Sequence, residues 1–293
     1  MTLIILLVAL VVERFLGSLQ DYRRFDWLHA PARWMVAQRE RFEWLDGPIG
    51  VLILVGLPAA VAGWLQWLLG GWSLILAFLF GLAVFIYCLG PRSFYDQAKN
   101  LVDALDRGDE EAARWYMEGL LDRRPWPEGQ PLPKTASEAV FIAVCDRFLA
   151  VVFWFALLGP LGAVMYRAAS ELRKTCLSTG ACGKGESGLG DAVAWLYQVL
   201  GWVPARLTAY TFAALGSFMD ARESCRRVRE AGERHWPDPH EDLLACAGCG
   251  ALRLEEVAPE GGRVVCQSLD LARRSIWLWV VVIALFTLWG WIA

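Results

Sequence analysis

Several motifs that mark common enzyme chemistries are missing from this 293-residue chain. It has no GxxxxGK[ST] phosphate loop, no HExxH metal-binding helix and no GxSxG nucleophile elbow. Histidine is scarce, since His29, His235 and His240 are the only three and do not form a sequence motif. Histidine-based acid–base catalysis is therefore a weak hypothesis, and no motif predicts a catalytic residue, a metal or a cofactor.

Charge is also sparse. Only 20% of the residues are charged, the net charge is −3, and no basic tract is interleaved with aromatic residues. This composition argues against nucleic acid as a partner, because such binding depends on dense positive charge. Hydrophobic residues, in contrast, make up 56% of the chain, and it contains 16 Trp.

Long uncharged runs predict an all-α, polytopic helical membrane protein that forms one integral-membrane domain over 1–293. About four to five membrane segments are expected, a number set by the length that spans a bilayer. The segments cover roughly 2–12 (partial), 48–69, 72–90, 148–169, 192–218 (broken) and 276–292. The lipid bilayer is thus an expected partner.

Proline and glycine predict where these segments bend or end. Pro58 is expected to kink the helix over 48–69, and Gly70-Gly71 predicts a tight turn before 72–90. Gly159-Pro160 interrupts 148–169, and Pro204 with Arg206 predicts a break inside 192–218. The N-terminal run lacks a basic start and a small-residue cleavage site, so we expect it to be retained.

Two hydrophilic regions, 91–147 and 219–275, predict a cytoplasmic layer of amphipathic helices. Gly108-Asp109 is expected to separate two helices, with Asp109 as an N-cap, and Gly261-Gly262 predicts a turn. If 192–218 crosses the membrane, most Arg and Lys residues of the loops fall on one side. The positive-inside rule then makes that side cytoplasmic and predicts a multi-pass protein of the bacterial inner membrane.

The eight cysteines allow several interpretations. Cys246 and Cys249 form a CxxC pair, for which a zinc site and simple small-residue packing are alternatives; no second pair is present, which favours packing. Cys176 and Cys182 share the loop expected outside the cytoplasm, where a disulfide could form between them.

Two segments place arginine directly against apolar runs. They are LGPLGAVMYRAASELR over 158–173, with Arg167, and WVPARLT over 202–208, with Arg206. A charge in that setting is costly unless it pairs or binds an anion. The expected ligand-binding residues are Tyr166, Arg167, Arg206, Glu138 and Asp146. The structural alternative is that Arg206 pairs with Asp146 or Glu138 and joins two helices.

These segments, with LGPLGAVMYRA at 158–168 and VPARLT at 203–208, resemble the CobD/CbiB family of late cobalamin assembly. ERFLG at 13–17, LHAP at 28–31, ALDRGDEEAAR at 104–114 and GALRL at 250–254 are similar too, so the resemblance covers essentially the whole chain. The start MTLIILLVALVVERF and the segment WVPARL most closely resemble the AmpE branch. The resemblance adds His29, in LHAP, to the expected ligand-binding residues.

The chain departs from the family at positions that carry its acidic and amide groups. Against the family's ESxxENxxD helix it reads SEAVFIAVCD, which keeps Glu138 and Asp146 but has Ile142 and Ala143 at the middle positions. Against YRAxNTLD it reads YRAASELR, which puts Ser170 and Arg173 at the amide and acid. These losses remove oxygen ligands for a phosphate-bound Mg²⁺ and favour a non-catalytic protein, although they leave enzymatic activity open.

The resemblance to AmpE then implies an inner-membrane regulatory or sensory protein of β-lactamase induction and cell-wall recycling. Its partner would be a cytoplasmic cell-wall amidase or a muropeptide-like anionic ligand. Two alternatives remain at this point: a CobD/CbiB-like ligase that forms adenosylcobinamide phosphate, and a transporter of an anionic wall fragment.

Overall fold

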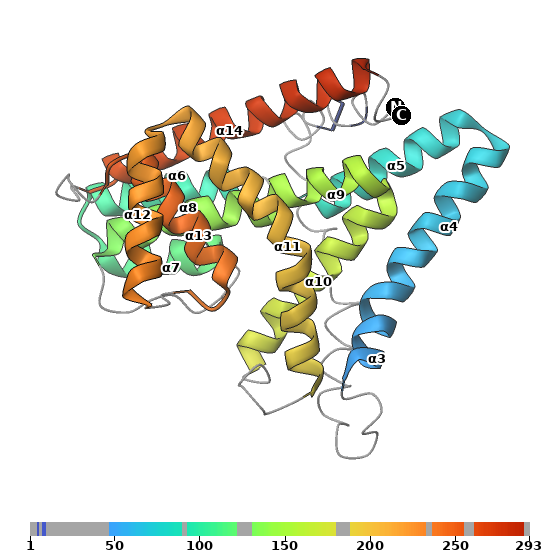
Figure 1. Ribbon diagram of the computed structural model, residues 1–293, viewed down its shortest axis with the longest axis horizontal. Coiled ribbons are helices and arrows are strands. Elements are labelled where there is room, and N and C mark those ends of the chain that lie inside the picture. The colour runs from blue at the N-terminus through green and yellow to red at the C-terminus, as the bar shows by residue number, and fades with distance from the viewer. Residues whose placement is uncertain are drawn as a thin grey trace. The chain divides into compact units, whose positions relative to one another are not determined.

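A computed structural model describes residues 5, 8–9, 47–89, 93–121, 131–179, 188–232, 236–254 and 261–289. All regular elements within these ranges are helices (Figure 1). The chain divides into two compact units. Unit 1 contains Met1–Pro91, Ala150–Leu200 and Val280–Ala293, and unit 2 contains Arg92–Leu149 and Gly201–Trp279.

The first continuous described stretch of unit 1, residues 47–89, is an apolar helical hairpin. Helix α3 (Pro48–Val51), the π-helical turn η3 (Leu52–Gly56) and α4 (Leu57–Trp72) follow one another without a break. The wide π turn lies directly before Pro58, as expected where proline removes a helical hydrogen bond. Helix α5 (Leu74–Cys88) returns after Ser73, whose backbone is extended. The turn expected at Gly70-Gly71 is therefore wrong by a few residues, because both glycines remain helical in α4.

Helices α9 (Ala150–Leu158) and α10 (Pro160–Thr179) complete the described packing of unit 1 together with the start of α11. Gly63 of α4 lies so close to α10 that a Cβ there would be 2.8 Å from a methyl carbon of Leu161. Phe85 of α5 contacts Phe155 of α9, with ring centroids 4.5 Å apart. Small residues and aromatic contacts thus hold these apolar helices together.

Within 148–169, the interruption expected at Gly159-Pro160 is confirmed, but the expected start of the apolar helix at 148 is too late. Gly159 has φ +64°, a conformation that glycine adopts readily, and it ends α9 before Pro160 starts α10. The long apolar helix instead runs from Leu132 through α8 (Leu132–Val144), the π-helical turn η4 (Cys145–Leu149) and α9. The hydrophilic region expected up to residue 147 is also wrong over α8, because this helix is buried from Thr135 onward.

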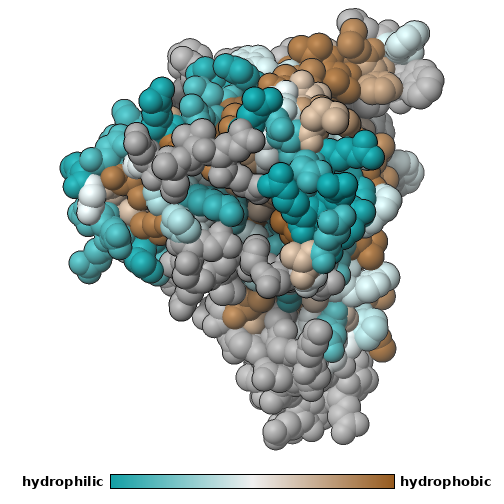
Figure 2. Space-filling view, turned by 60° about the vertical axis from the view of Figure 1, so that its left-hand side comes forward, coloured by the Kyte–Doolittle hydropathy of each residue, from teal (hydrophilic) through white to brown (hydrophobic). Residues whose placement is uncertain are grey.

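Two helices among the described residues are long and apolar enough to cross a membrane, namely Pro48–Trp72 with 25 residues and Leu132–Leu158 with 27. Helix α5 is apolar but shorter. Many large apolar side chains stay exposed on α4 and α5, including those of Trp64, Trp67, Trp72, Leu74 and Ile75. Figure 2 shows separate hydrophobic and hydrophilic areas on the face that it draws. These features describe a membrane-type helical protein.

Helix α11 (Gly188–Leu215) corrects the expected break in 192–218. It is continuous, with Pro204 inside it. Proline has no N–H, so the carbonyl of Leu200, four residues earlier, lacks its helical donor. The indole Nε1–H of Trp154 donates to that carbonyl at 3.0 Å. The helix can therefore continue past Pro204 with the orphaned carbonyl satisfied.

Unit 2 is built from α6 (Ser93–Asp106), α7 (Glu110–Leu120), α8, α12 (Phe218–Ala231), α13 (Pro239–Ala251) and the first part of α14 (Arg263–Leu288). The backbone N–H of Ala112 donates to Asp109 Oδ1 at 3.0 Å, which confirms Asp109 as an N-cap. A turn at Gly261 precedes α14, as the sequence predicted. The predicted segment 276–292 lies on α14 up to Leu288, and 290–293 fall outside the described residues, as does most of 2–12.

Helix α13 is the packed centre of unit 2. Its residues from Leu244 to Ala251 are buried, and it contacts both α8 and α12. Gly248 makes the closest approach, since a Cβ there would overlap the ring of Phe141 on α8. Only small residues fit this contact.

Candidate functional site

Glu138 lies on buried α8, and its carboxylate is held by an indole. Trp236 Nε1–H donates to Glu138 Oε2 at 3.0 Å, and both side chains are almost fully buried. Trp236 is positioned by the start of α13, where its backbone N–H donates to Asp242 Oδ1 at 3.0 Å. A capping box between Asp238 and Glu241 fixes that helix end.

Asp146 and Arg147 lie on η4, and both are buried. Arg147 Nη2 donates to the backbone carbonyls of Gly119 at 3.1 Å and Leu120 at 2.7 Å. These carbonyls end α7, where orphan acceptors and the helix dipole favour a cation. Arg147 therefore joins η4 to α7, and the π-helical turn, a feature often found at functional sites, presents Asp146 beside it.

Helix α10 carries a buried cluster of charged side chains in unit 1. Arg167 Nη2 lies 2.8 Å from Glu171 Oε1, and Lys174 Nζ lies 3.0 Å from the same oxygen. Arg173, which replaces the family's acid, is also buried. Tyr166 packs near Tyr197 of α11, with ring centroids 6.3 Å apart. Glu171, one residue after the family's amide position, is thus the acidic centre of this cluster.

Arg206 lies on the part of α11 that belongs to unit 2. Its guanidinium stacks over the Trp202 ring at 4.0 Å from the centroid, and Nη1 donates to the Trp202 carbonyl at 3.3 Å. The structural alternative, in which Arg206 pairs with Asp146 or Glu138, is wrong, because Arg206 lines an open pocket while both acids are buried elsewhere in unit 2.

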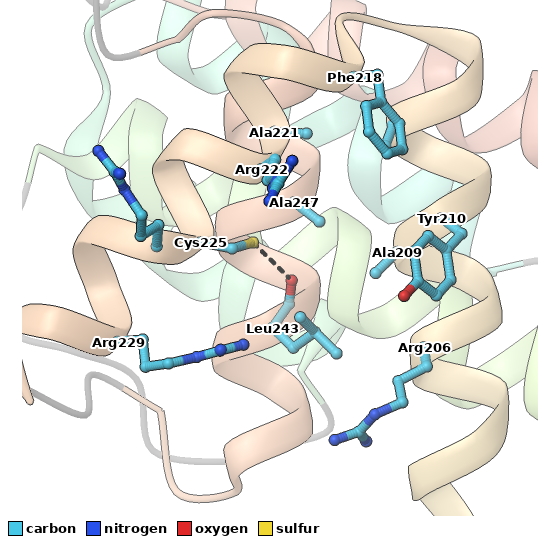
Figure 3. Close-up of a pocket in the computed structure, with 12 residues that line it drawn as sticks. Arg206, Ala209, Tyr210, Phe218, Ala221, Arg222, Cys225, Arg229, Leu243 and Ala247 are labelled. Atoms are coloured by element: carbon cyan, nitrogen blue, oxygen red, sulfur yellow. Dashed lines mark hydrogen bonds between the residues drawn. The ribbon is translucent and has the colours of Figure 1, made fainter.

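The pocket beside Arg206 has a volume of about 470 Å³ and lies between α11, α12 and α13 (Figure 3). All of its charged lining residues are arginines, with Arg206 from α11 and Arg222, Arg226 and Arg229 from α12. The other lining residues are Ala209, Tyr210, Ala213, Phe218, Ala221, Cys225, Leu243 and Ala247. Of the expected site residues that the structure describes, only Arg206 lines this pocket.

Two carboxylates on α12 are stabilised in their charged form. The hydrogen bond from Arg226 holds the pKa of Glu223 below its usual value. Hydrogen bonds from Ser217 and then Arg253 lower the pKa of Asp220, whose Oδ2 lies 2.6 Å from Arg253 Nε. Both acids are therefore ionised at neutral pH, and each is engaged with its own arginine partner.

The expected site residues fall in both units. Tyr166 and Arg167 belong to unit 1, and Glu138, Asp146 and Arg206 belong to unit 2. His29 lies outside the described residues. The sequence interpretation missed the arginines of α12, although Arg222, Arg226 and Arg229 recur at the spacing of one helix face, which was the available signal.

Two cysteines form a covalent link that the sequence interpretation did not anticipate. Cys225 of α12 and Cys246 of α13 are joined by a disulfide. No group of three or more His, Cys, Asp or Glu side chains suited to a metal occurs among the described residues. Cys176 lies on α10 and not in the expected loop, because that helix continues to Thr179. Cys182 falls outside the described residues, so the Cys176–Cys182 disulfide stays a prediction.

The helical fold, with its two long apolar helices, is that of a membrane-type helical protein. The model of the family described as CobD/Cbib protein matches residues 6–260, and the chain belongs to the CobD/CbiB family. No solved structure gives a significant match.

Curated relatives support the same family. A cobalamin biosynthesis protein CobD of Stutzerimonas stutzeri is 28% identical over 259 residues, which are 82% of this chain and 82% of the relative. The cobalamin biosynthesis protein CobD of Chromobacterium violaceum is 26% identical over 308 residues, or 93% of this chain and 92% of the relative. The cobalamin biosynthesis protein CobD of Pelobacter propionicus is 28% identical over 237 residues, or 78% of this chain and 72% of the relative.

These relatives overturn the expected AmpE-type function in β-lactamase induction. Each of them carries the name of a cobalamin biosynthesis protein, and the family match agrees with that name. The AmpE interpretation gave too much weight to two side chains, Ile142 and Ala143, and to the similarity of the chain ends. Similarity along most of the chain is the stronger observation.

Proposed function

We propose that this chain acts in cobalamin biosynthesis as a CobD-type protein of the bacterial inner membrane, with several membrane crossings. The observation that carries the proposal is the extent of the similarity. The family match covers residues 6–260, and the relatives named CobD align along most of both chains. The two long apolar helices support the membrane location.

The reaction proposed is the amide-forming step that gives adenosylcobinamide phosphate, which the resemblance to CobD/CbiB implied. Glu138 and Asp146 are the acids that the chain keeps from the family's acidic helix. Each carboxylate lies in a largely water-excluded environment, where it acts more strongly on a nearby charge than in water. Separately, in unit 1, Arg167 is proposed to bind an anionic group, with Tyr166 next to it in the sequence.

Ile142 and Ala143 limit what α8 can contribute. Both are buried, at 2% and 4% exposure, so this face of the helix is apolar packing. Glu138 and Asp146 are therefore the only acidic residues on the helix from α8 into η4 to which we assign a role in the reaction. A cation that arrives with a phosphate substrate would find a carboxylate oxygen on this helix at Glu138 or at Asp146.

Growth complementation tests this function. The chain is expressed in a bacterial strain that lacks its own CobD-type gene and requires cobinamide. We expect growth without cobinamide for the wild-type chain, loss of growth for Asp146→Asn, and normal growth for Asp191→Asn, a matched change at an exposed residue of α11. Absence of growth with the wild-type chain present in the membrane at normal level would refute the proposal.

A further inference from the structure

The pocket of unit 2 described above has an unusual charge distribution. Four arginines line it, and none of its lining residues is acidic. Arg222 and Arg229 extend from α12, and Arg206 extends from α11 (Figure 3). Like charges gathered around one space repel each other, and a bound anion would remove that repulsion.

The arginines differ in how far they are already neutralised. Arg226 lies 2.9 Å from a Glu223 oxygen and 3.8 Å from a Glu230 oxygen. Arg222, Arg229 and Arg206 have no carboxylate within ion-pair distance among the described residues. Three guanidinium groups therefore keep their full charge and most of their N–H donors available to a ligand.

The number of available charges indicates the class of ligand. A carboxylate carries one negative charge and would leave the pocket strongly positive, whereas a phosphate monoester carries about −1.5 to −2 and offers three acceptor oxygens. Guanidinium groups match phosphate oxygens in paired hydrogen bonds. The pocket volume, about 470 Å³, also exceeds what a bare ion needs and is typical of sites for small organic molecules.

The remaining walls are apolar and small. Ala209, Ala213, Ala221 and Ala247 leave space between the helices, and the rings of Tyr210 and Phe218 lie at the exposed side. Such walls suit a carbon skeleton attached to the phosphate. We propose that this pocket, formed by Arg206, Arg222 and Arg229 around an alanine-lined floor, binds a phosphate-bearing anion.

The phosphate could belong to a soluble molecule or to a lipid headgroup, and the experiment separates these sources. Full-length protein is placed in nanodiscs of neutral phosphatidylcholine and titrated with inorganic pyrophosphate by calorimetry. We expect saturable binding, weakened about tenfold in Arg222→Gln and in Arg229→Gln, as expected for loss of a charge-assisted hydrogen bond.

Arg227→Gln is the matched control. Arg227 lies on the same helix, is exposed and contacts Glu223 at 3.4 Å, but it does not line the pocket. We expect it to change pyrophosphate affinity less than about twofold, because its exposed charge is screened by solvent and does not line the pocket. Equal weakening in Arg227→Gln and Arg222→Gln would overturn the proposal, because it would indicate diffuse surface charge.

A second arm uses nanodiscs that also contain phosphatidylglycerol. The site belongs to a lipid phosphate if these discs abolish pyrophosphate binding and native mass spectrometry detects phosphatidylglycerol on the wild-type protein but not on Arg222→Gln. Unchanged pyrophosphate binding assigns it to a soluble phosphate compound. If neither pyrophosphate nor phosphatidylglycerol binds saturably to the wild-type protein, the proposal is wrong. These readouts measure binding alone, so they are independent of cobalamin synthesis.

Discussion

The indole of Trp154 donates to the carbonyl of Leu200 at 3.0 Å, the carbonyl that Pro204 leaves without a helical donor. This contact explains how α11 remains one helix through the WVPARL segment. Without that donor, a buried carbonyl would be unsatisfied, which costs about 1–3 kcal/mol. A side chain forty-six positions away in sequence thus stabilises the helix at its proline.

A double-mutant cycle tests this relationship. Trp154→Phe removes the donor and should lower the free energy of unfolding in detergent by about 1–2 kcal/mol. Pro204→Ala supplies a backbone N–H to the Leu200 carbonyl, so the same Trp154→Phe change should cost about 1 kcal/mol less in the Pro204→Ala background. Packing losses occur in both backgrounds and cancel. Equal costs in the two backgrounds would show that the indole does not serve that carbonyl.

The Glu138–Trp236 contact predicts a second stability effect. Trp236→Phe removes one hydrogen bond to a buried carboxylate and should destabilise the protein by about 2 kcal/mol, since a hydrogen bond to a buried charged group is costly to lose. Trp115→Phe is the control, because Trp115 is 68% exposed. Its effect should stay within about 0.5 kcal/mol. Chemical unfolding of both purified variants provides the comparison, and similar values for the two would contradict the contact.

The close approach of α13 to α8 predicts a packing effect. Gly248→Ala places a methyl group against the ring of Phe141 and should destabilise the protein by about 1–3 kcal/mol. Gly70→Ala is the matched control, because a Cβ there meets nothing within 4 Å and alanine favours the helix. Thermal unfolding should therefore show a lower midpoint for Gly248→Ala and an unchanged or higher one for Gly70→Ala. The opposite order would contradict the packing described.

The disulfide predicts a labelling pattern. When purified protein is denatured without reductant and alkylated, Cys225 and Cys246 should remain unmodified, because neither has a thiol. Cys266, which is exposed, should be fully modified. Peptide mass spectrometry before and after reduction measures the alkylation of all three cysteines. Modification of Cys225 and Cys246 to the same extent as Cys266 would show that the bond is absent.

The same labelling in intact cells bears on membrane orientation. Disulfides persist in oxidising compartments and are rare in the cytoplasm. If 219–275 is cytoplasmic, as the positive-inside rule predicts, Cys225 and Cys246 should be reduced in cells and become oxidised after purification. An intact bond in freshly quenched cells would place α12 and α13 outside the cytoplasm and overturn that orientation.

Local signals in the sequence predicted local structure well. The cap at Asp109 and the turn at Gly261 were correct because each depends on neighbouring residues only. The bounds of the apolar helices were less accurate. Residues such as Glu138 and Arg147 made 132–147 look hydrophilic, whereas the structure buries them through partners from distant positions, Trp236 and the end of α7.

Pro204 and the α12 arginines show two further limits. The sequence shows that proline removes a hydrogen bond, but it does not show that Trp154 replaces it. In the sequence, the arginines of α12 look like those of any exposed helix face. The pocket that they line exists only because α11 and α13 pack beside α12. The family itself was predictable from short segments spread along the chain, while the function was misjudged from two positions, Ile142 and Ala143.

The most direct test of a role in cobalamin biosynthesis is the amount of adenosylcobinamide phosphate in cells. A strain that lacks its own CobD-type gene is supplied with this chain or with the Asp146→Asn variant, and corrinoids are measured by mass spectrometry. We expect adenosylcobinamide phosphate to appear with the wild-type chain and to be absent with Asp146→Asn at equal protein level. Its absence with the wild-type chain, while a known CobD restores it in the same strain, would contradict the proposed function.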